Sequence, residues 1–236
     1  EVAFDVFDLE SIIETAIAAG AKLKQPIQQK DFPHGRIKWC EITGISSLKH
    51  TLVERIGITP LLPESWIVEK QELSTIKSLF TGIDHLVLNV ASKELETTIS
   101  WYEKVFGFNR EQSFKIQTKT SGLHSQVMFH PVSGIQLPVN QPMTANSQIQ
   151  EFLDLNRGAG IQHIALKTSQ IIRATQRLRL KCLSFLSVPN SYYQKLRESE
   201  QDFPLSDCEF KEIIEQQILI DLQFKENCPD RRPSIN

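Results

Sequence analysis

Residues 82–108 read GIDHLVLNVASKELETTISWYEKVFGF, and this stretch decides the fold. Its apolar, β-rich beginning at 83–90 predicts a strand. A helix is predicted over about 93–106, with Ser92 as its N-cap. The buried stripe of that helix consists of residues at helical spacing, namely Leu95, Ile99, Tyr102 and Phe106. Gly107 can adopt the left-handed conformation that ends a helix.

The same strand–helix order recurs on both sides of this stretch. Upstream, a strand leads into an amphipathic helix that ends at Gly20, and downstream a strand leads into a helix that ends near residue 181. The predicted strands outside 82–108 are 2–7, 35–43, 48–55, 112–118, 124–130, 134–138, 161–167, 183–188 and 218–222. We therefore predict an α+β fold of repeated βαβββ modules, two of which pair to build a curved, partly open barrel-like sheet around a cavity.

Composition excludes several classes of function. The 236 residues suggest one or two domains, and 26 basic against 28 acidic residues give a net charge of −2. No basic field is available to hold a nucleic acid. No apolar run is long enough to span a membrane, and the acidic first twenty residues do not resemble a signal peptide. Four isolated cysteines favour a reducing compartment, and we expect a cytoplasmic protein (Cys40, Cys182, Cys208 and Cys228).

The two ends of the sequence depart from this modular pattern. We interpret residues 1–70 as the remnant of an N-terminal domain whose first module is missing, because the sequence opens within a strand. Residues 71–81 are predicted to be a linker, and 82–223 to form an incomplete C-terminal domain. Residues 224–236 (FKENCPDRRPSIN) are polar and hold two prolines, so we expect an exposed tail.

Two of the six histidines occupy matching positions. His85 and His163 each lie early in the first strand of a module, and pseudo-symmetry brings such positions together. The residues alone leave two alternatives, metal ligation or hydrogen-bonded core histidines. A metal site would need a third ligand from a later strand, and Glu226 and Asp230 in the polar tail are poor candidates. The other histidines are interpreted as structural, surface or turn residues (His34, His50, His124 and His130).

A group of polar residues accompanies the histidines: Ser125, Asn140, Gln148 and Gln162. We expect Asn140 in a turn bounded by Pro138 and Pro142. Ser147 is a candidate N-cap for a helix that begins with Gln148. Without further context, each of these side chains fits ordinary turn and capping polarity.

Several longer motifs resemble one enzyme family. They include GIDHLVLNV (82–90), WYEKVFGF (101–108), SQVMFHPVSGIQLPVNQP (125–142), SQIQEFLDLNRGAGIQHIALKT (147–168), SFLSVPNSYY (184–193) and EQQILID (215–221). Together with VAFDV, GAKLKQPIQ and HTLVERIGITPLLPESWI, they make the chain similar to the 4-hydroxyphenylpyruvate dioxygenases, especially the cyanobacterial type, from residue 1 to about 223. That family belongs to the vicinal-oxygen-chelate superfamily.

The resemblance implies an Fe(2+) enzyme of tyrosine catabolism, which also supplies plastoquinone and tocopherol synthesis. Such an enzyme converts 4-hydroxyphenylpyruvate and O2 to homogentisate and CO2. Iron would bind in the C-terminal domain through His85, His163 and a glutamate. The substrate would contact Ser125, Asn140, Gln148 and Gln162, and no catalytic residue is implied beyond the metal ligands. The resemblance implies no nucleic-acid or membrane partner and leaves a homo-oligomer possible.

The resemblance stops after Gln223, before the family's pocket phenylalanine, glutamate ligand and gating helix. We therefore expect no third ligand in this chain, weak iron binding and little turnover. Hydroxymandelate synthase, which uses the same substrate and ligands, is an alternative. A non-catalytic binding module or decayed fragment is another. A glyoxalase-like lyase is disfavoured, because Leu86–Val90 and Ile164–Lys167 offer no additional acidic ligand.

Overall fold

A computed structural model describes residues 1–45, 48–60, 79–117, 121–199, 205–221 and 234–235. The chain divides into two compact units. Unit 1 comprises Glu1–Ser74 and Ile83–Leu166, and unit 2 comprises Thr75–Gly82 and Lys167–Asn236. The domain boundaries expected from the sequence stay a prediction. Most of the predicted linker and of the predicted polar tail lies outside the described residues.

The first module of unit 1 is a four-stranded sheet with one helix. Its elements are β1 (Val2–Val6), α1 (Leu9–Ala18), β2 (Lys22–Phe32), β3 (Gly35–Thr43) and β4 (Lys49–Gly57). The strand order is β1-β4-β3-β2, with β1 parallel to β4 and the other pairs antiparallel. Asp8 caps α1, because its carboxylate accepts a hydrogen bond from the Ser11 N–H at 2.9 Å.

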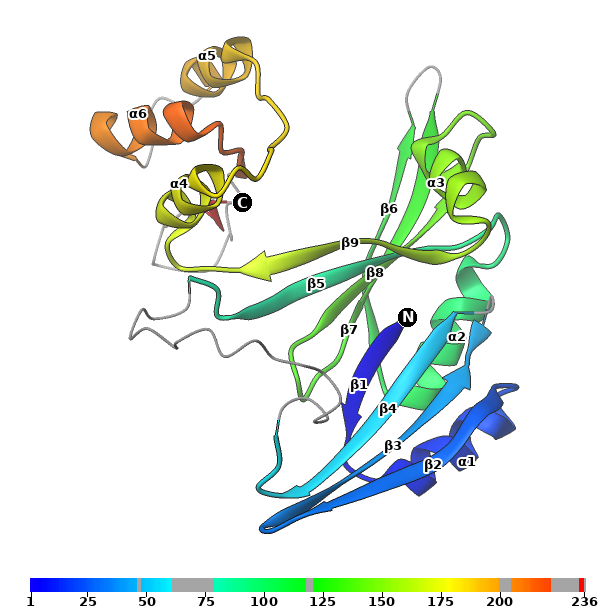
Figure 1. The fold of residues 1–236 in the computed structure, drawn as a ribbon. Coiled ribbons are helices and arrows are strands. Elements are labelled where there is room, and N and C mark those ends of the chain that lie inside the picture. The colour runs from blue at the N-terminus through cyan, green and yellow to red at the C-terminus, as the bar shows by residue number, and fades with distance from the viewer. Residues whose placement is uncertain (46–47, 61–78, 118–120, 200–204, 222–233, 236) are drawn as a thin grey trace. The chain divides into compact units, whose positions relative to one another are not determined.

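The second module repeats this topology (Figure 1). Its elements are β5 (Gly82–Asn89), α2 (Leu95–Phe106), β6 (Asn109–Gln117), β7 (Gly122–Phe129) and β8 (Gln136–Pro142). The strand order is β6-β7-β8-β5, and β5 is parallel to β8. The sheet continues with a fifth strand, β9 (Gly160–Lys167), which follows α3 (Gln148–Asn156). The predicted repetition of βαβββ modules is thus confirmed for these two.

Two local predictions in the second module are wrong. Ser92 does not cap α2, because Lys93 has a positive φ of 73° and the helix begins only after Glu94. Residues 138–142 form part of β8 rather than a turn. Both prolines fit there, since Pro138 has no partner in the register with β5 and Pro142 is the last residue of the strand.

A single hydrophobic core joins the two modules. It contains Leu52 from β4, Ile99 from α2 and Val139 from β8, all at most 1% exposed. His50 is 1% exposed, and its imidazole lies between the Leu48 carbonyl at 3.1 Å and the Tyr102 hydroxyl at 2.8 Å. The prediction that His50 is structural is confirmed, and this side chain links β4 to α2.

Unit 2 consists mainly of helices in the described residues. Its elements are α4 (Ile171–Leu180), α5 (Asn190–Ser199), α6 (Asp207–Gln216) and the short strands β10 (Ile220–Asp221) and β11 (Ser234–Ile235). A second core cluster includes Tyr193, Phe210 and Ile213. Leu183–Val188, expected as a strand, is mostly exposed and forms none. In the described residues, no helix is long and apolar enough to cross a membrane.

Tyrosine side chains of α5 hold the start of β10. The Tyr192 hydroxyl donates to the Ile220 carbonyl at 2.8 Å and accepts from the Ile220 N–H at 3.0 Å. The Tyr193 hydroxyl donates to the Ile218 carbonyl at 3.1 Å. The Tyr192 side chain therefore gives a hydrogen bond to each of the two backbone polar groups of Ile220.

Candidate metal and substrate site

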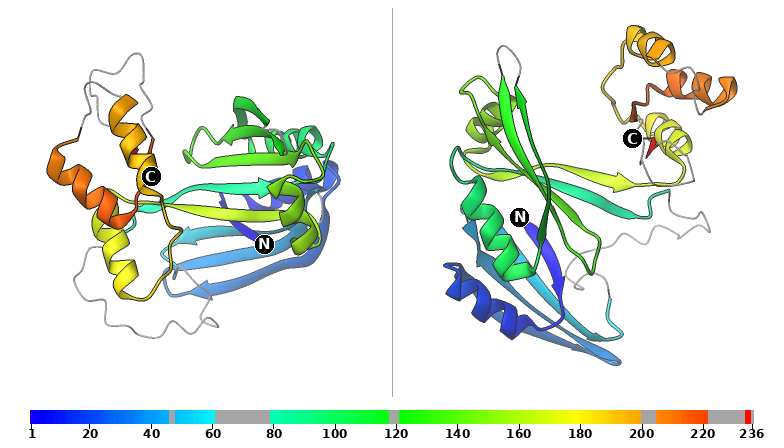
Figure 2. Two further views of the ribbon diagram at one scale, coloured as in Figure 1. Left: turned by 90° about the horizontal axis from the view of Figure 1, so that it is seen from above. Right: turned by 180° about the vertical axis from the view of Figure 1, so that it is seen from behind.

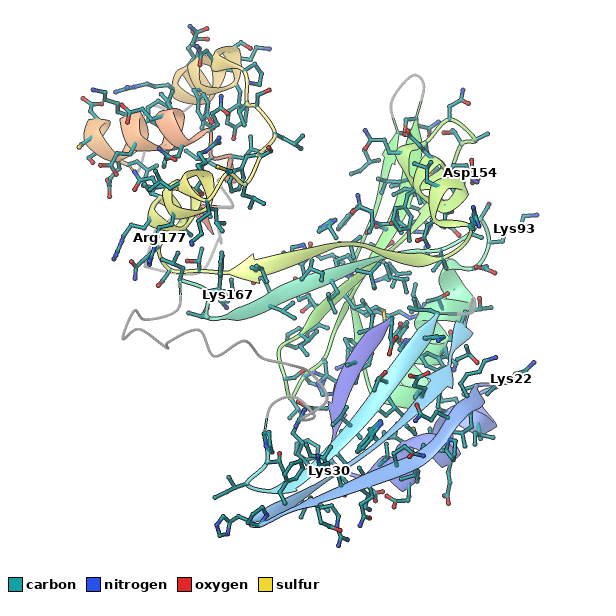
Figure 3. The ribbon with its side chains drawn as sticks, in the orientation of Figure 1. Lys22, Lys30, Lys93, Asp154, Lys167 and Arg177 are labelled. Atoms are coloured by element: carbon teal, nitrogen blue, oxygen red, sulfur yellow. The ribbon has the colours of Figure 1, made fainter. Side chains whose placement is uncertain are left out.

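The pairing of β5 with β9 places two histidines opposite each other. The two strands are neighbours and run antiparallel (Figures 1 and 2). Their ladder begins where the Thr81 N–H donates to the carbonyl of Lys167, a residue that is labelled in Figure 3, at 2.8 Å. His85 lies four residues after Thr81 on β5, and His163 lies four residues before Lys167 on β9. Their ring centroids are 5.5 Å apart and their planes are at 77°.

Each imidazole has one nitrogen engaged by the residue that precedes it. His85 Nδ1 is 2.9 Å from a carboxylate oxygen of Asp84, and His163 Nδ1 contacts the amide oxygen of Gln162. A hydrogen bond from Nδ1–H to an oxygen fixes the tautomer and leaves the Nε2 lone pair available. Two imidazoles whose Nε2 atoms have no hydrogen bond among the described residues are a donor pair that suits a divalent transition-metal ion.

Burial and charge keep His163 in the form that such an ion needs. Partial burial lowers the pKa of His163, and electrostatic repulsion by His85 lowers it further. The neutral imidazole is therefore favoured near pH 7. His85 is partly covered, with 29% of its side chain exposed, so both rings are accessible from solvent.

A row of polar side chains crosses the same sheet. Asn89 on β5 pairs with Asn140 on β8, and Asn140 pairs with Ser125 on β7. Asn140 Nδ2 donates to Asn89 Oδ1 at 3.3 Å. Asn89 and Ser125 are buried, at 0% and 2% exposure, while Asn140 is partly exposed. The alternation along β5 places His85 on the same face as Asn89.

That face lies away from the main core. On β5, the core takes the intervening residues Leu86, Leu88 and Val90, and on β8 it takes Leu137 and Val139. The histidine and the polar row therefore occupy the opposite side of a sheet whose other side is packed against α2. A rigid sheet with one side left for polar groups is a suitable platform for a small-molecule site.

The other two predicted substrate residues have different positions. Gln148 is the exposed first residue of α3, directly after Ser147, whose hydroxyl accepts from the Gln150 N–H at 3.1 Å. The predicted N-cap role of Ser147 is confirmed. Gln162 is exposed and contacts His163.

Sequence reasoning missed Asp84 and Asn89. Both were visible as polar residues within an apolar strand, IDHLVLNV, which is the signal that could have identified them. The contact of Asp84 with His85 depends on a side-chain rotamer, and the contact of Asn89 with Asn140 depends on the register of β5 with β8. Neither can be read from the sequence.

The carboxylates of the described residues do not complete a metal site with the two histidines. Among these residues, the only cluster of three candidate ligands is Asp8, Glu10 and Glu54, in the first module. Lys38 Nζ lies 2.9 Å from Glu10 and 3.6 Å from Glu54, and the Leu9 N–H donates to Glu54 at 2.8 Å. A cation and a helix N-terminus already partner this cluster. No carboxylate in the described part joins His85 and His163 as a third ligand.

Fold and site together define a protein class. Residues 82–203 match the model of the glyoxalase/bleomycin resistance protein/dioxygenase superfamily, and the chain belongs to this superfamily. The chain is 39% identical over 237 residues to the 4-hydroxyphenylpyruvate dioxygenase of Dictyostelium discoideum. This match covers 95% of the chain and 64% of that protein. For the enzyme of the same name from Caenorhabditis elegans, identity is 36% over 209 residues, covering 84% and 53%.

A solved structure shares the fold. A mutant of 4-hydroxymandelate synthase from Streptomyces coelicolor superimposes with a TM-score of 0.73 at 21% identity, covering 94% of this chain and 62% of that one. The vicinal-oxygen-chelate fold expected from the sequence is confirmed. The chain spans about three fifths of the length of the curated relatives it matches.

Proposed function

We propose that this chain supplies metal- and substrate-binding side chains of a 4-hydroxyphenylpyruvate dioxygenase. The observation that carries the proposal is the opposed pair His85 and His163, each with Nδ1 engaged and with no hydrogen bond to Nε2 among the described residues. The relatives named 4-hydroxyphenylpyruvate dioxygenase support it. The metal would be Fe(2+), and the reactants would be 4-hydroxyphenylpyruvate and O2. The three described cysteines, which form no disulfide, support a cytoplasmic location.

The reaction would convert 4-hydroxyphenylpyruvate and O2 to homogentisate and CO2. When bound by two imidazoles and a carboxylate, Fe(2+) keeps positions open for an α-keto acid and O2 and supplies the redox chemistry. Asp84 and Gln162 would hold the two imidazoles in their ligating tautomer and orientation. Ser125 and Asn140 would orient the substrate, and a fixed orientation is itself a contribution to rate.

Metal binding by the chain provides the first test. Anaerobic titration calorimetry at high protein concentration is expected to detect one weak Fe(2+) site, and His163→Ala should abolish detectable binding, because loss of an outer partner alone costs about 10–100-fold. His34→Ala, an exposed histidine of the first module, is the matched control and should leave the affinity unchanged. Equal affinity in His163→Ala and the unmodified chain would contradict the proposed site.

The activity is tested in a chimera. The remaining N- and C-terminal parts of the Dictyostelium discoideum relative are joined before Glu1 and after Asp221, and product is identified by chromatography with Fe(2+), ascorbate and 4-hydroxyphenylpyruvate. We expect homogentisate, and none from the chimera carrying His163→Ala. Hydroxymandelate as product would favour the synthase alternative. Metal binding without any product would favour a non-catalytic binding module.

A further inference from the structure

Asn89 has a feature that the proposed function does not use. Its side chain is completely buried, and its Nδ2 has no hydrogen-bond partner among the described residues. Its Oδ1 accepts from Asn140 Nδ2 at 3.3 Å. Burying an amide with unmade hydrogen bonds costs stability, and isosteric apolar residues such as leucine avoid that cost. A polar residue at this position therefore calls for an explanation other than packing.

The backbone around the two amides is firmly held. Asn89 and Asn140 are register partners in the parallel pair β5–β8, and the Val90 N–H donates to the Asn140 carbonyl at 2.9 Å. On the other side, Asn140 is paired with Ser125 of β7. Since both neighbouring strands fix the Asn140 backbone, the remaining freedom lies in its side-chain torsions. The hydrogen bond to Asn89 restricts these torsions.

This hydrogen bond also determines what Asn140 can offer to a ligand. One of its two N–H groups is used by Asn89, and its carbonyl oxygen Oδ1 stays available as an acceptor. The keto form of 4-hydroxyphenylpyruvate, with an ionised carboxylate, has one hydrogen-bond donor, the phenol O–H. An acceptor on a partly exposed side chain in the polar row is complementary to that donor.

We infer that Asn89 is a positioning residue that orients the Asn140 amide so that its Oδ1 accepts a hydrogen bond from the substrate phenol. The inference rests on the proposed function, since it takes 4-hydroxyphenylpyruvate as the ligand. Asn89 acts through Asn140 and does not itself touch the substrate. Its replacement should therefore weaken recognition of the phenol and leave recognition of the α-keto acid intact.

The test compares two ligands that differ only in the phenol oxygen. Binding of 4-hydroxyphenylpyruvate and of phenylpyruvate to the Fe(2+)-loaded chimera described above is measured by calorimetry without O2, and the ratio of the two affinities is the readout. Asn89→Leu should lower this ratio about twofold to tenfold, the range of one net hydrogen bond. Asn89→Asp, which keeps an oxygen opposite Asn140 Nδ2, should preserve it within about twofold.

Two further variants separate positioning from a structural effect. Leu88→Val alters the core side of the same strand and should lower thermal stability with an unchanged affinity ratio. Asn140→Leu should lower the ratio, and adding Asn89→Leu to it should have no further effect, because both changes remove one interaction. Thermal unfolding of each variant verifies that it is folded, and Asn89→Ala, which removes the same amide in a smaller side chain and should lower the ratio likewise, keeps the test available if Asn89→Leu does not fold.

The outcomes distinguish the inference from the proposed function. If the unmodified chimera prefers 4-hydroxyphenylpyruvate and its folded Asn89→Leu variant keeps that preference, the positioning role is overturned while the proposed function stands. If the unmodified chimera binds both ligands equally or binds neither, the proposed function is overturned, and the role of Asn89 falls with it. Additive effects of Asn89→Leu and Asn140→Leu would also overturn the positioning role.

Discussion

The first and second modules have the same strand order and the same helix placement, yet their side chains serve different purposes. In both, the first strand is parallel to the last strand of the module. The first strand of the second module carries Asp84, His85 and Asn89 among apolar residues. The corresponding strand β1 reads VAFDV and contains no histidine. The single histidine within the strands of the first module, His50, is buried in the core.

This difference shows that topology positions a site without creating one. Both sheets bury one side against a helix, and both could present the other side to a ligand. Only in the second module does that side combine imidazole, carboxamide and hydroxyl groups. The first module contributes through the shared core instead, and His50 bonded to Tyr102 is the polar contact that joins the two. The first module thus stabilises the sheet on which the second module carries the candidate site.

The largest expected effect tests whether the two modules share one core. Leu52→Ala in β4 and Leu137→Ala in β8 should each lower the free energy of unfolding by about 2–5 kcal/mol, because each leaves a cavity in the same cluster. Thermal unfolding followed by circular dichroism and by tryptophan fluorescence should then show coincident transitions in unit 1. Two separate transitions, each affected by one of the variants, would contradict a core shared by the two modules.

The second prediction concerns pH and the polar contact between the modules. Burial lowers the pKa of His50 from its ordinary value of 6.5 to about 4. The unfolded chain therefore takes up a proton between these values and the folded chain does not, so stability should fall as pH decreases from about 6.5 to about 4. The whole effect is about 3 kcal/mol.

Urea unfolding across this pH range measures the effect of His50. In His50→Leu, the contribution of His50 to the dependence of unfolding free energy on pH should disappear. His34 is an exposed histidine of the same module, and His34→Leu should retain that contribution of His50. An unchanged pH dependence in His50→Leu would show that His50 does not titrate differently in the folded and unfolded chain.

The third prediction sharpens the contrast between the two first strands. Asp84→Ala in β5 should weaken Fe(2+) binding about 10–100-fold, because the carboxylate that holds His85 Nδ1 is lost. Asp84→Asn, which keeps an acceptor oxygen, should weaken it less. Asp5→Ala in β1 removes a carboxylate paired with Arg55 at 3.0 Å and is the matched control. Calorimetry should give equal affinities for Asp5→Ala and the unmodified chain, and a loss there would contradict the assignment of the site to the second module.

The smallest expected effect concerns the ion pairs that join a strand of each module to its helix. Arg110 on β6 bonds Glu96 and Glu103 of α2 at the surface, and Arg110→Ala should lower the free energy of unfolding by at most about 1 kcal/mol. Lys38 on β3 bonds Glu10 of α1 and also faces the buried Glu54. Lys38→Ala should cost more than Arg110→Ala, because it leaves a buried carboxylate without its cation. Equal losses in chemical denaturation would contradict this ordering.

Much of the fold could be predicted from periodicity. The predicted strands 2–7, 35–43 and 161–167 each lie within two residues of an observed strand, since alternating or continuous apolar runs determine which backbone can bury them. The predicted helix end at Gly107 is confirmed, with φ of 70°. The N-cap at Ser92 failed because a capping side chain is only one way to begin a helix, and Lys93 takes a left-handed conformation there.

The site was predictable in part. The matching positions of His85 and His163 suggested that they meet, and the antiparallel pair β5–β9 brings their rings to 5.5 Å. The turn expected at Pro138–Pro142 hid the fact that Asn140 lies in the middle of a sheet, because prolines normally indicate a break. Asn89 could not be identified as its partner, since the register of a parallel pair formed 51 residues apart has no local sequence signal.

The Tyr192 hydroxyl, which both donates to and accepts from the backbone of Ile220, has a consequence for exchange kinetics. An amide hydrogen exchanges with solvent only when its hydrogen bond opens. For Ile220 that opening includes a rotation or displacement of one phenol ring on α5. Deuterium uptake at Ile220 should therefore report the fluctuations of that ring, and Tyr192→Phe should convert it into one of the fast-exchanging amides of unit 2.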